Sequence, residues 1–135
     1  MLHKLNILLL LGLLFTPMSA LKADTNTLPT ITMINPVEGS IIEGFLDTPD
    51  GNVGVDIKVP IGTQVKAAAQ GTIAQIAKSR VDETLLVLLR HKNNIYTVYS
   101  MLNDVNVKEN DVVNSGETIG TIGSGNPPFL HFEVR

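Results

Sequence analysis

Short runs of β-branched and other apolar residues, separated by turn residues, fill the chain from Pro36 onward. Residues 84–91 and 95–101 are two such runs, and the Lys92-Asn93-Asn94 turn between them predicts a hairpin. There is no long amphipathic helical pattern and no repeat of fixed period. The sequence therefore predicts an all-β fold, an antiparallel sandwich or barrel. In the run Val53–Val59, alternation places four residues inward: Val53, Val55, Ile57 and Val59.

The N-terminus has the layout of a secretory signal. His3 and Lys4 give a basic start, an apolar run extends to Phe15, and Pro17 ends it before small residues. The apolar run is short for a helix that crosses a bilayer. We expect residues 1–23 to be a signal peptide, cleaved after Ala20 or Ala23. An uncleaved N-terminal anchor is the alternative, and the break at Pro17 makes it the weaker one.

The rest of the chain is expected to hold a linker and one domain. Residues 24–35 are rich in Thr and Asn and predict a short linker, so the β domain is expected over 36–135. An exported domain would lie in the periplasm of a two-membrane bacterium or outside the cell, with no membrane contact after signal cleavage. A domain of this length buries enough surface to fold without a metal or disulfides.

Composition narrows the classes of partner. The chain has no cysteine, which excludes a disulfide framework and a thiol for lipid attachment. Its formal net charge is -3, and no basic stripe is present to follow phosphates. Nucleic acid is therefore not an expected partner.

Two segments carry candidate metal ligands. Asn52, Gly54 and Asp56 share one face of an extended segment, and Phe129 and His131 share a face of another. One carboxylate and one imidazole could then meet across a groove. A hydrolytic zinc centre needs three protein ligands and an open position for water. No third ligand is evident.

Five segments together resemble the lysostaphin or LytM-type zinc endopeptidase domain, also called the duplicated hybrid motif. They occur in the same order as in that family and cover nearly the whole of residues 36–135. The segments are Val55–Ile57, Pro60–Ile73, Tyr96–Leu102, Val107–Gly123 and Leu130–Arg135.

The resemblance implies a groove-bearing β domain that cuts peptide cross-links in bacterial cell walls. Its zinc ligands are a His and an Asp four residues apart and the second His of a His-x-His strand. Asp56 and His131 match two of them, whereas Asn52 replaces the leading His. The two histidines that assist catalysis are replaced by Met101, in the Tyr-x-His-Leu segment, and by Phe129, in the His-x-His strand.

Each replacement removes a chemical capability. An amide oxygen at Asn52 is a poor substitute for the imidazole nitrogen that zinc prefers. Met101 and Phe129 cannot transfer a proton, a contribution often worth about 10²–10⁴-fold. We therefore expect no catalytic residues and no required cofactor. Asp56 and His131 either hold zinc weakly or form a hydrogen-bonded pair without metal.

Four further residues have more than one possible role. His91 is predicted to be a partly exposed hairpin residue whose ring packs or bonds to backbone, rather than a replacement ligand. Glu133 could be a carboxylate ligand, but a solvated or arginine-paired strand residue is favoured. Met101 and Phe129 fit ordinary core packing, although an apolar groove floor is favoured. The expected groove, available for partner binding, is formed by Asn52, Asp56, Tyr99, Met101, Phe129 and His131.

The functional expectation is an exported, catalytically degenerate domain that acts by binding in peptidoglycan remodelling. The resemblance extends to non-hydrolytic members of the EnvC and NlpD type, which activate cell-wall amidases during cell separation. A weak zinc endopeptidase and a stand-alone peptidoglycan-binding module are the alternatives. A lipoyl or biotinyl carrier is disfavoured, because Lys92 lacks the residues that usually flank a modified lysine.

Overall fold

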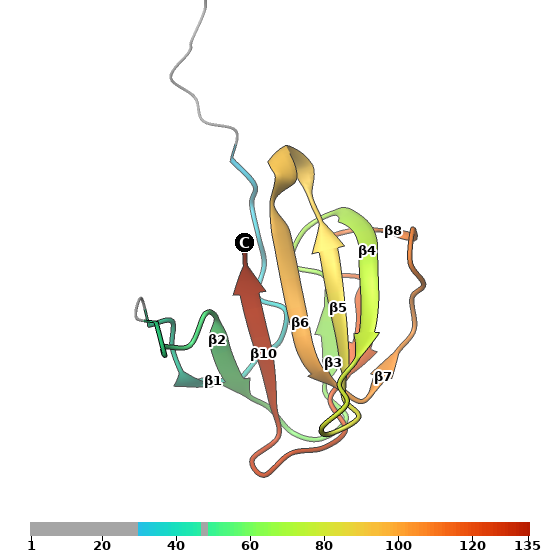
Figure 1. Ribbon diagram of the computed structural model, residues 1–135. Coiled ribbons are helices and arrows are strands. Elements are labelled where there is room, and N and C mark those ends of the chain that lie inside the picture. Colours follow the sequence, from blue (N-terminus) through green and yellow to red (C-terminus); the bar gives the residue numbers. More distant parts are fainter. Residues whose placement is uncertain (1–29, 47–48) are drawn as a thin grey trace, which may run out of the picture. The chain divides into compact units, whose positions relative to one another are not determined.

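The computed structural model describes residues 30–46 and 49–135, and residues 31–135 form one compact unit (Figure 1). Nearly all regular structure in this part of the chain is extended, with one 3₁₀ turn at Lys92–Asn94 (η1). The strands are β1 (Ser40–Glu43), β2 (Val55–Lys58), β3 (Gln64–Lys66), β4 (Gly71–Lys78), β5 (Leu85–Arg90), β6 (Tyr96–Leu102), β7 (Asp104–Val105), β8 (Val112–Val113), β9 (Thr118–Thr121) and β10 (Phe129–Val134).

The strands form two antiparallel sheets. The large sheet has the order β1-β2-β10-β6-β5-β4-β8, and the small sheet has the order β3-β9-β7. The predicted hairpin is present as β5 and β6 around η1. The last strand, β10, lies between β2 and β6 rather than at an edge (Figure 1). The prediction of an all-β, antiparallel fold is confirmed.

Apolar side chains from both sheets form the core. Val65 and Ile119 of the small sheet and Ile73, Leu89 and Leu130 of the large sheet have no exposed surface and belong to one cluster. Removing such side chains from water is the main stabilising term for a domain of this kind. Most of this core could be expected from the alternation in the strands.

The alternation fails at one end of the run Val53–Val59. Ile57 and Val59 are buried and Val55 is partly buried against the core, but Val53 is 55% exposed. The strand begins only at Val55, so the two-residue alternation does not extend back to Val53.

The N-terminal boundary of the domain also differs from the prediction. Residues 31–35 belong to the folded unit: Met33 packs against the core, and the Ile34 amide donates to the Ala68 carbonyl at 2.8 Å. The predicted linker 24–35 therefore extends too far. The predicted signal, residues 1–23, and the first part of that linker lie outside the described residues. Within the described ranges, no helix has the length and apolar character needed to cross a membrane.

A row of polar residues crosses the large sheet. Glu43 of β1 is in register with Asp56 of β2, Asp56 with His131 of β10, and His131 with Ser100 of β6. Residues in direct register on neighbouring strands point to the same face of a sheet. The fold thus places Asp56 and His131 side by side on one sheet face, not on opposite walls of a groove as the sequence suggested.

Candidate functional site

The candidate site is centred on a hydrogen-bonded pair between adjacent strands. His131 Nδ1 lies 2.6 Å from Asp56 Oδ1. Both side chains are mostly buried, with 20% of His131 and 14% of Asp56 exposed. The pair joins β2 to β10 through side chains in addition to the backbone ladder.

The other side of the His131 ring contacts a second carboxylate. Its Nε2 lies 3.0 Å from Glu133 Oε1, and Arg135 donates from Nε to Glu133 Oε2. Burial raises the pKa of Glu133, but hydrogen bonds from Arg135 and His131 outweigh this effect and hold that pKa below its ordinary value. Glu133 is thus arginine-paired, as one of its predicted roles required, but it is buried rather than solvated.

Asn52 uses its side chain within its own loop. Its Oδ1 accepts a hydrogen bond from the Gly54 amide at 3.2 Å, which closes a local turn of the kind asparagine favours. Its Nδ2 is buried and has no hydrogen-bond partner among the described residues. The oxygen that would have to act as a third metal ligand is therefore already engaged.

These contacts can be compared with what a zinc ion requires. Two donors at about 2.0–2.1 Å from a tetrahedral zinc are about 3.3 Å apart. Asp56 and His131 are instead at hydrogen-bonding distance, and Asn52 Oδ1 faces the Gly54 amide. No group of three or more His, Cys, Asp or Glu side chains in residues 30–46 and 49–135 is arranged to hold a metal. The residues present do not fit a zinc centre.

Met101 lies at a bulge in β6. Ser100 and Met101 together oppose Leu86 of β5, and Met101 has a φ of 71°, a conformation that is strained for a residue other than glycine. The two bulge residues line a hollow of about 310 Å³, together with apolar Ala77, Leu85 and Leu86 and with polar Lys78, Ser79, Asp82 and Thr84. Met101 thus lines a recess at the surface, whose exposed area is mainly apolar, rather than the interior of the core.

Phe129 and Tyr99 behave differently from each other. Phe129 is partly exposed at the start of β10, in register with Lys58. Tyr99 has no exposed surface, accepts a hydrogen bond from the Ala68 amide at 2.8 Å, and packs 5.3 Å from the Phe132 ring, centroid to centroid. The prediction that Tyr99 lines a partner-binding groove is wrong, because it points into the core.

His91 is a buried structural residue. Nδ1 lies 2.8 Å from the Gln70 carbonyl, and Nε2 lies 2.8 Å from Thr97 Oγ1. Because a carbonyl only accepts, Nδ1 carries the hydrogen in this arrangement. Of the two predicted arrangements of the ring, the bond to backbone is present, but the predicted partial exposure is not, since only 6% of His91 is exposed.

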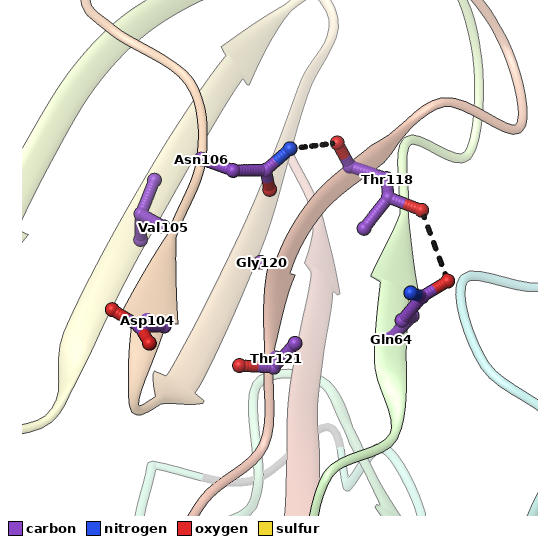
Figure 2. Close-up of a pocket in the computed structure, with 7 residues that line it drawn as sticks. All are labelled: Gln64, Asp104, Val105, Asn106, Thr118, Gly120 and Thr121. Atoms are coloured by element: carbon purple, nitrogen blue, oxygen red, sulfur yellow. Dashed lines mark hydrogen bonds between the residues drawn. The ribbon is translucent and has the colours of Figure 1, made fainter.

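A second hollow, of about 500 Å³, lies on the small sheet (Figure 2). Gln64 of β3 stands on one side and Asp104 and Asn106 on the other, with Gly120 of β9 between them. Asn106 donates to the Thr118 carbonyl at 3.0 Å. None of the candidate residues predicted from the sequence lines this hollow.

The sequence predicted an arginine partner for Glu133 but not its contact with His131 or its burial. Residues 131, 133 and 135 alternate with the core residues Leu130 and Phe132, so a two-residue period was the available signal. Glu43 was missed because its register with Asp56 follows a shift in the β1–β2 pairing. No local pattern predicts such a shift.

Known proteins share both the sequence and the fold. The chain is 38% identical over 105 residues to the cell division protein DipM of Caulobacter vibrioides, covering 74% of this chain and 17% of that protein. It is 30% identical over 109 residues to the murein hydrolase activator NlpD of Escherichia coli, covering 79% and 29%. The chain therefore spans less than a third of the length of either relative.

Solved structures give the same result. Lysostaphin from Staphylococcus simulans superposes with a TM-score of 0.62 at 30% identity, covering 71% of this chain and 42% of that one. A zinc-containing peptidase from Vibrio cholerae superposes with a TM-score of 0.63 at 27% identity, covering 74% and 35%. The model of peptidase family M23 matches residues 50–135. The chain belongs to peptidase family M23.

Proposed function

We propose that this chain is an exported M23 domain that does not hydrolyse peptidoglycan but binds during its remodelling, where it activates an amidase in cell separation. The observation that carries the proposal is the closed Asp56–His131 pair beside an Asn52 whose oxygen is engaged by Gly54. This arrangement leaves too few free donors to hold a metal and activate water.

The positions that would transfer protons support the same proposal. Met101 and Phe129 carry no titratable group, so the sheet face around His131 lacks an acid or base at either family position. Met101 instead lines an apolar recess, a kind of surface used for recognition. The names of two relatives, a murein hydrolase activator and a cell division protein, are consistent with this role.

The test measures the cleavage of two different kinds of bond in one substrate. Purified sacculi are incubated with a peptidoglycan amidase, with this protein, and with both together. Amidase action frees stem peptides from glycan, whereas endopeptidase action converts cross-linked dimers to monomers, and chromatography separates the two product sets. We expect this protein alone to give neither product and to increase the amidase products. Cross-link cleavage by this protein alone would refute the proposal.

Matched variants test whether the recess takes part. Met101→Glu places a charge beside the apolar side chains of Leu85 and Leu86 in the hollow and should reduce amidase activation by about ten-fold or more. Val112→Glu adds the same charge at a 68% exposed site on β8 and should leave activation intact. Equal loss in both variants would show that added charge, rather than the recess, is responsible.

A weak zinc endopeptidase is the second candidate, favoured by the retention of Asp56 and His131 at two ligand positions of the family. It predicts near-stoichiometric zinc in the purified protein and cross-link cleavage that His131→Ala abolishes. A stand-alone peptidoglycan-binding module predicts cosedimentation with sacculi but no effect on amidase products. The same assay therefore separates all three functions.

A further inference from the structure

The large sheet has a cluster of exposed apolar side chains at one edge. Half of the ten large hydrophobic residues that are exposed in the described part of the chain lie between positions 41 and 53. Their exposed fractions range from 49% to 64%. We call this cluster the edge patch: Ile41, Ile42, Phe45, Leu46 and Val53.

A backbone hydrogen bond brings three members of the edge patch close together. The Leu46 amide donates to the Asn52 carbonyl at 2.9 Å, which places residues 45–46 beside Val53. The other two members belong to β1, the outermost strand of the large sheet (Figure 1). β1 pairs only with β2 among the described strands, so its other edge is free to accept backbone hydrogen bonds.

The charges around this edge indicate what it can accept. Glu38, Glu43 and Asp50 are exposed within and beside the patch, against one lysine, Lys58, in register with Ser40. A second copy of the chain would bring the same three carboxylates together, and like charges across a strand pair are destabilising. A segment carrying Lys or Arg between apolar residues would instead match the edge in both charge and apolarity.

We propose that the outer edge of β1 is a docking site for an extended segment of another protein, which adds a strand to the large sheet. The segment would carry alternating basic and apolar residues, with backbone hydrogen bonds giving affinity and the carboxylates giving selectivity. This surface is three strands away from Met101 in the sheet order, so it is distinct from the proposed amidase recess.

The test uses defined peptides and protein purified after expression of the full chain. One short peptide alternates Lys and Val, a second alternates Glu and Val, and a third is the Lys peptide N-methylated at every second residue. Amide NMR shifts locate binding, and fluorescence anisotropy gives the affinity. We expect the Lys peptide to shift the amides of Ser40–Glu43 and to bind about ten-fold or more tightly than either other peptide.

Charge-reversed variants distinguish specific docking from non-specific peptide binding. The double variant Glu38→Lys with Glu43→Lys should invert the preference, so that the Glu peptide binds more tightly, while Val112→Lys on the opposite sheet edge should not. Circular dichroism confirms that each variant is folded. Three outcomes would overturn the proposal. The N-methylated peptide could bind equally well, the amide shifts could lie elsewhere in the sheet, or a dimer could protect the β1 amides. Amidase activation in the separate assay does not depend on these results.

Discussion

Asn52 shows how a local hydrogen bond can make a side chain at a metal-ligand position unavailable to a metal. Its amide oxygen accepts the Gly54 hydrogen bond, so the residue supports its own turn. Its buried Nδ2 lacks a partner among the described residues, an arrangement that costs about 1–3 kcal/mol in proteins. The position therefore contributes little to stability beyond its local turn and is a suitable one to mutate.

Asn52→His should raise zinc affinity without creating a peptidase. The new imidazole adds a nitrogen donor four residues before Asp56, and we expect about ten-fold tighter binding or more, measured by competition with a chromogenic chelator. Met101 and Phe129 still cannot transfer protons, so sacculi should remain uncleaved. Asn52→Ala is the control, and it should bind no more tightly than the parent. Unchanged affinity in Asn52→His would show that the loop cannot present a ligand here.

Tyr99 was predicted to line a groove, but the structure places it in the core. Its position in the Tyr-x-His-Leu segment suggested a groove, but its hydroxyl bonds to the Ala68 amide and to Thr97 Oγ1 inside the core. Period-two alternation alone could have placed it inward, on the face opposite Ser100. Family position was a poorer guide than strand geometry at this residue.

Burial raises the pKa of Tyr99, and this has a consequence at high pH. The unfolded chain ionises this tyrosine near its ordinary value, about 10, whereas the folded chain holds it neutral. The free energy of unfolding should therefore be insensitive to this group below pH 10 and should fall as the pH rises above that value. In Tyr96→Phe protein, which leaves Tyr99 as the single tyrosine, phenolate absorbance should appear together with loss of the circular dichroism signal. Phenolate formation in fully folded protein would contradict this prediction.

At the scale of the elements, β10 determines where the candidate site lies. It pairs with β2 on one side and β6 on the other, which sets His131 beside both Asp56 and Ser100. Hydrophobic alternation predicted that β2 and β10 are strands, but alternation carries no information about which strands pair. That pairing joins residues 75 positions apart, so it depends on the whole topology rather than on local pattern.

Gly54 allows the start of β2 to approach β10 closely. A Cβ at this position would lie 2.2 Å from the Phe132 carbonyl oxygen and 2.8 Å from Glu133 Cγ. Gly54→Ala should therefore push the strands apart, lower the free energy of unfolding by about 1–3 kcal/mol, and weaken the Asp56–His131 pair. Urea unfolding measures the first effect, and His131 ring NMR shifts report the second.

Gly44→Ala is the matched control, because a Cβ there would meet nothing within 4 Å. It should change the free energy of unfolding by less than about 0.5 kcal/mol. A similar loss in both variants would contradict this explanation, because a Gly→Ala change by itself reduces the entropy of the unfolded chain and favours the folded state.

Across the whole molecule, apolar burial determines stability and polar residues determine the site. The two sheets share one core of fully buried side chains, and the described part of the chain contains no cysteine or metal cluster. Composition and strand alternation were enough to predict this architecture. They could not predict the burial of Glu133 or the exposed edge at β1, because both depend on which strand occupies which place in the sheet.

The contact between Asp56 and His131 predicts how zinc affects the thermal stability of the molecule. A ligand at about 100 times its Kd adds about 2.7 kcal/mol of stability, and each kcal/mol shifts Tm by about 4–8 °C in a domain near this size. A well-formed zinc site would thus raise Tm by roughly ten degrees or more when zinc replaces a chelator. Because Asp56 and His131 are hydrogen-bonded to each other, we expect the Tm values from scanning calorimetry in zinc and in EDTA to agree within about 2 °C. Asn52→His should widen that difference, and a large shift in the parent protein would instead show that the pair opens to admit the ion.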